Sequence, residues 1–194
     1  MRPSPQLWRD PLAWRVSAFM GLQSLFFYSL LSWLPALLRS EGIDRETAGA
    51  LLSVMMLAGI PTCLLVPVVA ARRPDQRAAV VATLAVLAAG LAGLLIAPAA
   101  LAGLWVTLIG FAQGALLALA FLFFGLRSPD QEHAAQLAAM AQTVGYTVAA
   151  AGPLVVGILR EVSGGWTAPL VFLLAMLAPL LAAGLGSARA RQVG

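Results

Sequence analysis

Six long apolar stretches, separated by short polar segments, take up most of the chain. A transmembrane α-helix needs about 20 mostly apolar residues, and each stretch reaches that length. The pattern therefore predicts an all-α integral membrane protein, a single six-helix bundle over residues 1–194. The predicted spans are 12–38, 47–71, 78–97, 101–126, 134–160 and 166–187.

Polar residues before two of the spans predict where their helices begin. Asp44 is expected to cap the second helix, with Glu46 in the first turn, where a negative charge suits the helix dipole. Ser128, Pro129 and Gln131 have the spacing of a capping box, with proline at the first helical position. We therefore expect the fifth helix to start near Pro129, upstream of its apolar span.

The even spacing of the spans also indicates an internal repeat. Helices one to three and four to six would form two inverted three-helix repeats, an arrangement found in membrane transporters. Gln23 and Gln113 lie at similar depths in the first and fourth spans, shortly after Gly21 and Gly110. An inverted repeat predicts such a correspondence.

The composition agrees with a lipid environment and excludes several kinds of function. Hydrophobic residues make up 61% of the chain and charged residues 10%, whereas soluble domains carry about 25% charged residues. Cys63 is the single cysteine, so an internal disulfide and a cysteine-based metal cluster are excluded, and no cofactor or metal is expected. No Ser–His–Asp set, zinc-ligand spacing or phosphate-binding loop occurs, so we do not expect an enzyme.

The arginines predict how the chain is oriented in the membrane. All 12 basic residues are Arg, which together with the Ala, Leu and Gly content favours a GC-rich bacterial genome and hence a bacterial inner membrane. The arginines lie in the predicted loops, where basic residues set topology, so they do not indicate nucleic-acid binding. Nine lie on the side of the amino terminus and three on the opposite side, which predicts that both termini are cytoplasmic. The nine are Arg2, Arg9, Arg15, Arg72, Arg73, Arg77, Arg127, Arg189 and Arg191, and the three are Arg39, Arg45 and Arg160.

Asp, Glu, Arg and His are absent from the middle of every predicted span, but uncharged polar side chains are not. Proton-driven carriers usually hold an acid or a histidine within the membrane, so no proton relay is expected in this chain. A polar side chain that faces lipid is costly, so the uncharged ones should face protein or a water-filled cavity. The candidate substrate-binding residues are Gln23, Tyr28, Gln113, Gln142 and Tyr146.

The alternative for these residues is purely structural. Polar side chains can join transmembrane helices by hydrogen bonds, each worth about 0.6 to 2 kcal/mol. The serines and threonines of the first and fifth spans can also bond to carbonyl groups of their own helix. We therefore treat cavity lining as a hypothesis for the glutamines and tyrosines only.

Several segments resemble one transporter family. The segments LWRDPLAW (7–14), FMGLQSL (19–25) with Tyr28, and WLP (33–35) resemble the seventh helix of cyanate/nitroimidazole-type permeases of the major facilitator superfamily. The segments MAQTVGY (140–146), GP (152–153) and GGW (164–166) are similar to their eleventh helix and the loop after it, and LRSPD (126–130) is similar to the loop before it. The loop ARRPDQR (71–77) looks like a degraded form of the basic loop motif of that superfamily.

The resemblance implies the carboxy-terminal six-helix half of a secondary carrier. Such carriers work by alternating access, in which two six-helix bundles rock around a central site. The first, fourth and fifth helices of this bundle would border the site, and the solute would be small and polar or anionic, with cyanate as one example. The partners would be the solute, the lipid bilayer and an amino-terminal six-helix bundle in the same or a separate chain. Two other interpretations remain open, a half-size protein that pairs with itself or with a separate half, and a membrane scaffold that does not transport.

Overall fold

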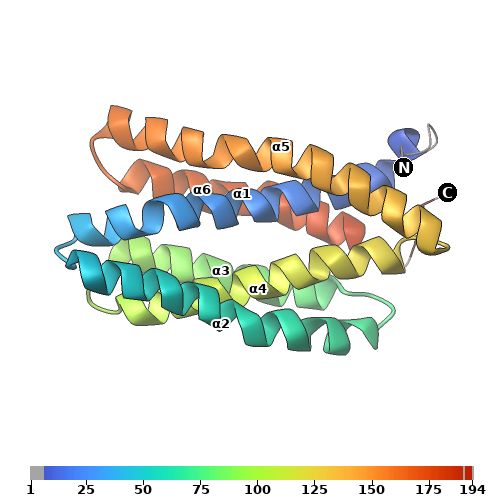
Figure 1. Cartoon of the computed structure of the whole chain (residues 1–194), viewed down its shortest axis with the longest axis horizontal. Helices are drawn as coiled ribbons and strands as arrows, with labels where there is room; N and C mark the ends of the chain where they lie inside the picture. Colours follow the sequence, from blue (N-terminus) through green and yellow to red (C-terminus); the bar gives the residue numbers. More distant parts are fainter. Residues whose placement is uncertain (1–6, 190, 194) are drawn as a thin grey trace.

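Six long helices run side by side in the computed structural model, which describes residues 7–189 and 191–193 (Figure 1). Each of the six is long and apolar enough to cross a membrane, and no strand occurs in these residues. This confirms the predicted all-α membrane fold. The helices are α1 (Pro11–Ser40), α2 (Arg45–Ala71), α3 (Arg77–Ile96), α4 (Ala102–Leu126), α5 (Gln131–Ser163) and α6 (Thr167–Ser187), preceded by a short 3-10 helix, η1 (Leu7–Arg9).

The helix ends confirm one predicted cap and correct another. Asp44 is the N-cap of α2, and its carboxylate accepts a hydrogen bond of 2.9 Å from the backbone N–H of Thr47. The fifth helix, however, does not start near Pro129 under a Ser128 cap. Asp130 is the N-cap, and its carboxylate accepts a hydrogen bond of 2.9 Å from the backbone N–H of His133. A charged acceptor binds the free N–H groups more strongly than a hydroxyl does, so α5 begins at Gln131.

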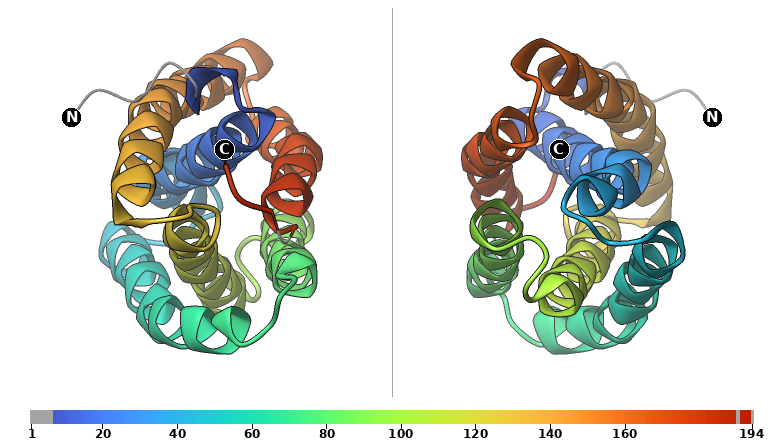
Figure 2. Two further views of the ribbon diagram at one scale, coloured as in Figure 1. Left: turned by 90° about the vertical axis from the view of Figure 1, so that its right-hand side faces the viewer. Right: turned by 90° about the vertical axis from the view of Figure 1, so that its left-hand side faces the viewer.

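The contacts between helices have the symmetry of two inverted repeats. Helix α1 packs most extensively on α5 and also on α6, whereas α4 packs most extensively on α2 and also on α3. Exchanging α1 with α4, α2 with α5 and α3 with α6 reproduces this pattern, as inverted three-helix repeats require. The bundle therefore has two groups, α1 with α5 and α6, and α4 with α2 and α3, which lie above and below each other in Figures 1 and 2.

Glycines bring the paired helices close together in both groups. A Cβ atom on Gly21 of α1 would lie 3.0 Å from the Cα atom of Gly145 in α5. A Cβ atom on Gly114 of α4 would overlap the carbonyl oxygen of Gly59 in α2. Small residues allow such close backbone contact between transmembrane helices. The same feature thus holds together the two symmetry-related helix pairs.

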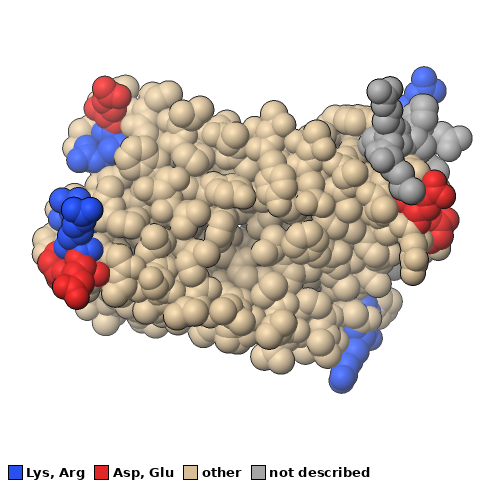
Figure 3. All heavy atoms as spheres, viewed as in Figure 1, with Lys and Arg blue, Asp and Glu red and all other residues tan. Residues whose placement is uncertain are grey.

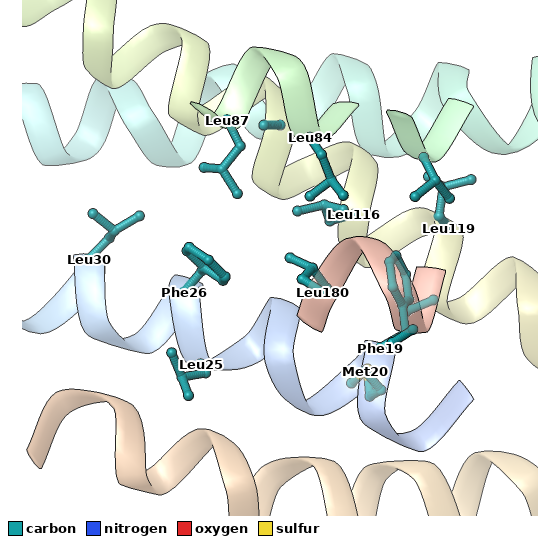
Figure 4. Close-up of a cluster of buried hydrophobic side chains, with 14 of the residues drawn as sticks. Phe19, Met20, Leu25, Phe26, Leu30, Leu84, Leu87, Leu116, Leu119 and Leu180 are labelled. Carbon is teal, nitrogen blue, oxygen red and sulfur yellow. The ribbon is translucent and has the colours of Figure 1, made fainter. Parts of the chain in front are cut away.

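The core of the bundle is apolar and lies where the two groups meet. Figure 4 shows Phe19, Phe26 and Leu30 of α1 together with Leu87 of α3 and Leu116 of α4. Phe19, Phe26, Leu87 and Leu116 are fully buried. Helix α1 therefore contributes the large side chains that join the two groups.

A buried arginine ties three helix ends together at the end of the bundle where the termini lie. Arg127, which follows α4, donates from Nε to the carbonyl of Ser187 at 2.7 Å and from Nη2 to the carbonyl of Ala188 at 3.1 Å. Its Nη2 also donates to Oε1 of Gln76, just before α3. Burial lowers the pKa of Arg127 from its ordinary value. The cation thus stabilises the ends of α4 and α6 and the start of α3 through carbonyl and amide oxygens.

Charged side chains gather at the two ends of the bundle, and the surface between them is uncharged (Figure 3). The end that carries the termini holds eight of the described arginines, because α1, α3 and α5 start there and α2, α4 and α6 end there. The opposite end holds Arg39, Arg45 and Arg160. Arg2, which the sequence count also placed on the side of the termini, lies outside the described residues. This distribution suits a bundle whose middle is surrounded by lipid.

Candidate functional site

A cavity of about 300 Å³ lies between α1, α2, α4 and α5. A hollow near the middle of one face, away from both charged ends, is visible in Figure 3. The lining side chains are uncharged and mostly apolar or glycine. They are Gln23, Ser24, Phe27 and Tyr28 of α1, Met55, Met56, Gly59, Ile60 and Cys63 of α2, Gly110, Gln113, Gly114 and Leu117 of α4, and Tyr146 of α5.

Two glutamines from the symmetry-related helices α1 and α4 line this cavity, and their amide groups differ. Gln23 is buried, and its Nε2 donates to Oγ of Ser24 at 2.8 Å and lies 3.4 Å from the sulfur of Met20. Gln113 is only 5% exposed, yet neither its Nε2 nor its Oε1 has a hydrogen-bond partner. A buried polar atom without a partner costs about 1–3 kcal/mol. The buried amide of Gln113 therefore has both its donor and its acceptor without a partner in the cavity wall.

Aromatic side chains of α1 and α5 form one wall of the cavity. The rings of Tyr28 and Tyr146 meet edge to face, with 6.4 Å between their centroids, and Tyr28 and Phe27 do so at 5.4 Å. Both tyrosines are about 40% exposed, so they lie where the cavity opens. Such a wall offers ring faces and edges to a planar apolar group, while the two hydroxyl groups can reach water.

Four of the five residues predicted from the sequence line the cavity, and Gln142 does not. Gln142 is half-buried and lies one helical turn before Tyr146, which is about 6 Å along the axis of α5. The helical pattern placed the two side chains on one side of α5 but contained no information on the depth of the cavity. Thr143 and Thr147 are not among the lining residues either, and each donates to a carbonyl of its own helix, at 2.8 and 2.9 Å.

The residues that α2 contributes to the cavity wall were not predicted from the sequence. This helix has almost no polar side chain, so nothing in its composition singled out Met55, Gly59 or Cys63. One available signal was spacing, because Gly59 and Cys63 are four residues apart and share a helix face. Cys63, the single cysteine of the chain, is half-buried in the cavity wall.

The chemistry of the cavity is that of hydrogen bonding and apolar contact. No Arg, His, Asp or Glu is among the lining residues, and the described part of the chain has no group of three or more possible metal ligands. The cavity can therefore hold a small molecule by amide and hydroxyl groups against aromatic and methionine side chains. Sites of this kind, mostly apolar with a few convergent polar groups, are typical of small-molecule binding.

Comparison with known proteins identifies relatives over most of the chain. The sequence model of the Major Facilitator Superfamily matches residues 2–153. The chain is 44% identical to the Uncharacterized transporter YycB of Bacillus subtilis (strain 168) over 191 residues, which is 98% of the chain and 48% of that protein. It is 40% identical over 165 residues to the 2-nitroimidazole transporter of Escherichia coli (strain K12), covering 85% of the chain and 42% of that protein.

A third relative and a solved structure complete the comparison. The Cyanate transport protein CynX of Escherichia coli (strain K12) is 31% identical over 80% of the chain and 40% of its own length. The crystal structure of the POT family transporter PepTSo matches the fold with a TM-score of 0.60, at 17% identity, over 89% of the chain and 36% of PepTSo. The chain thus spans about half the length of these relatives. The three sequence relatives are named as transporters, which confirms the prediction that this is not an enzyme.

Proposed function

The chain belongs to the major facilitator superfamily, and from this membership we propose that it is the carboxy-terminal six-helix half of a transporter for a small polar or anionic solute. The observation that carries the proposal is the uncharged cavity between α1, α2, α4 and α5, with the free amide of Gln113 in its wall. In this mechanism Gln113 bonds the solute, Gln23 and Ser24 support the same wall, and Tyr28 and Tyr146 flank the opening.

The second half of the transporter would cover the face that α2 and α5 leave open. Only 11% of the apolar span of α2 is buried within the bundle and 22% of that of α5, against 61% for α4. Leu57 and Leu64 of α2 and Leu154 of α5 are each more than 60% exposed. Both helices also border the cavity. A second six-helix bundle on this face would close the cavity, and rocking of the two bundles would open it to each side in turn.

The arrangement in the membrane follows from the arginines at the two ends. Eight of the described arginines lie at the end with the termini and three at the opposite end, and cytoplasmic ends carry the excess of basic residues. On this basis we propose that both termini are cytoplasmic, and we propose the bacterial inner membrane as the location of the bundle. The described parts of the helices have no Asp, Glu, Arg, Lys or His at mid-depth, so any proton relay would come from the other half.

An uptake assay tests the proposal. The chain is co-expressed with the half of the Bacillus subtilis relative that it does not match, and the pair is reconstituted into liposomes. The probes are 2-nitroimidazole, cyanate and 4-hydroxybenzoate, because relatives that match parts of the chain are named 2-nitroimidazole transporter, Cyanate transport protein CynX and, over 48% of the chain, Putative anionic 4-hydroxy-benzoate permease. Uptake of at least one probe above that of liposomes with either half alone is expected. If the pair forms a stable complex and moves none of the three probes, the proposal that it transports this class of solute is wrong.

Variants connect uptake to the cavity. Gln113→Met should raise the half-saturation concentration about tenfold, because the lost hydrogen bonds are worth about 1–1.5 kcal/mol. Gln142→Met, with the same chemical change outside the cavity, should leave it unchanged. A second candidate, pairing of two copies of this chain through the open face of α2 and α5, is tested by light scattering in mild detergent. A dimer that disappears when the other half is added would favour the proposed pairing over self-pairing.

A further inference from the structure

The free amide of Gln113 carries information about the solute beyond its size and polarity. A side-chain amide holds one acceptor and one donor group side by side, on Oε1 and Nε2. In Gln113 both atoms are buried without a partner, whereas the Nε2 of Gln23 is already engaged by Ser24. A ligand that satisfied only one of the two atoms would leave the desolvation cost of the other in place.

A bare anion does not match this arrangement. It offers acceptors only, so it could accept from Nε2 but would face the lone pairs of Oε1. None of the described lining residues carries a positive charge that would offset this repulsion. The complementary group is one that has a donor and an acceptor on the same edge, as in a primary amide, a lactam or a protonated carboxylic acid. Such an edge pairs with the glutamine amide through two parallel hydrogen bonds.

The rest of the cavity fits the remainder of such a molecule. Phe27, Tyr28 and Tyr146 form the aromatic wall, with neighbouring rings 5.4 and 6.4 Å apart, centroid to centroid. Met55 and Met56 of α2 line the same cavity, and thioether groups make favourable contacts with aromatic rings. A volume of about 300 Å³ accommodates a single ring with one polar substituent. The cavity therefore combines a flat apolar surface with a paired polar group.

We propose that Gln113 selects small planar aromatic solutes that carry a donor and an acceptor on one edge and bind in their uncharged form. This inference rests on the proposed transport function and narrows it to a substrate class. It makes Gln113 the specificity-determining residue, since the Nε2 of Gln23, the other amide in the cavity wall, is already engaged by Ser24.

Cys63 provides a direct test, because it is the single cysteine of the chain and lines the same cavity. The full chain in lipid nanodiscs is labelled with N-ethylmaleimide in the presence of benzamide or N-methylbenzamide. Benzamide has an N–H on the same edge as its carbonyl, whereas the N–H of N-methylbenzamide points away from that edge. Benzamide should slow labelling at a concentration about tenfold lower, which corresponds to one lost hydrogen bond of about 1.4 kcal/mol.

Two variants assign this discrimination to Gln113. Gln113→Met keeps the length of the side chain and should abolish the difference between the two probes, while Gln142→Met should preserve it. Equal unprotected labelling rates in all three proteins would show that the variants keep the cavity intact. If Gln113→Met still distinguishes the probes tenfold, another residue selects the solute and the inference is wrong.

Two further outcomes also contradict the inference while leaving transport to its own assay. The first is equal protection by both probes, and the second is protection by neither at millimolar concentration. In both cases the amide edge is not recognised. Uptake by the reconstituted pair is measured with other solutes, so the transport proposal stands or fails independently of this result.

Discussion

The close crossing of α2 and α4 allows a quantitative prediction at Gly114. A Cβ atom at this position would overlap the carbonyl oxygen of Gly59 and lie 2.6 Å from Oγ1 of Thr62. The backbone of α2 cannot move aside locally, so Gly114→Ala must push the two helices apart. The separation would also strain the hydrogen bond of 2.8 Å that Thr62 donates to the carbonyl of Phe111 across the same crossing.

The expected loss follows from two opposing effects. Overpacking a tight contact costs about 1–3 kcal/mol, and a weakened interhelical hydrogen bond adds about 0.6 kcal/mol. Alanine has a higher helix propensity than glycine, which offsets about 1 kcal/mol of that cost. Gly114→Ala should therefore lower the free energy of unfolding by about 0.6–2.6 kcal/mol.

Two glycines provide graded controls. Gly125 also lies in α4, and a Cβ atom there would have no neighbour within 4 Å, so Gly125→Ala should be neutral or slightly stabilising. A Cβ atom added at Gly59 would lie 3.2 Å from the carbonyl oxygen of Gly110. The change in the free energy of unfolding for Gly59→Ala should therefore fall between those for Gly114→Ala and Gly125→Ala. Unfolding of the purified chain by dodecyl sulfate in mixed micelles, followed by tryptophan fluorescence, gives the three values. If Gly114→Ala proves as stable as Gly125→Ala, the close crossing of α2 and α4 is not as described.

Two further predictions concern the ends of helices, and a third concerns the contact between α1 and α5. Arg127→Leu should destabilise the bundle by about 2–4 kcal/mol, because the buried carbonyls of Ser187 and Ala188 lose their donor. Thermal unfolding measures this loss, and Arg189→Gln, at an exposed position, is the control. The backbone N–H of Thr47 lowers the pKa of Asp44 by a hydrogen bond, and the backbone N–H of His133 does the same for Asp130. The stabilisation by each carboxylate is therefore complete at neutral pH and is lost as the pH falls below about 4. The melting temperature should therefore drop less between pH 6 and pH 3 in the double variant Asp44→Asn/Asp130→Asn than in the parent chain, and equal drops would contradict the role of the two caps. Trp33→Phe should lower the free energy of unfolding by about 1 kcal/mol, because Nε1 of Trp33 donates to the carbonyl of Pro153 at 2.8 Å and joins α1 to α5. An unchanged melting temperature would refute this contribution.

The sequence contained most of the information about the fold because each helix must cross a membrane by itself. An apolar stretch of the necessary length has few other structures available, so six stretches predicted six helices. The start of α5 could not be derived as securely, since Ser128 and Asp130 are both good N-caps two residues apart. The choice between them depends on which side chain reaches the free N–H groups, and Asp130 does so at His133.

The site was predictable only where polarity revealed it. Gln23 and Gln113 stood out because an amide is costly in an apolar span, and the inverted repeat explains why both reach one cavity. The depth of Gln142 and the participation of Met55 and Cys63 depend on how α2 and α5 pack against their partners. That packing is set by Gly21, Gly59, Gly114 and Gly145, and a glycine in a sequence does not reveal which helix it contacts.

We propose that the transported solute passes through the cavity between α1, α2, α4 and α5. The most direct test is uptake by the reconstituted pair, made with a cysteine-free second half, before and after treatment with a positively charged methanethiosulfonate reagent. Modification of Cys63 would place a bulky charged group in the cavity wall. Treatment should abolish uptake in the parent chain and have no effect in Cys63→Ser. Complete modification of Cys63 with undiminished uptake would show that the solute takes another path.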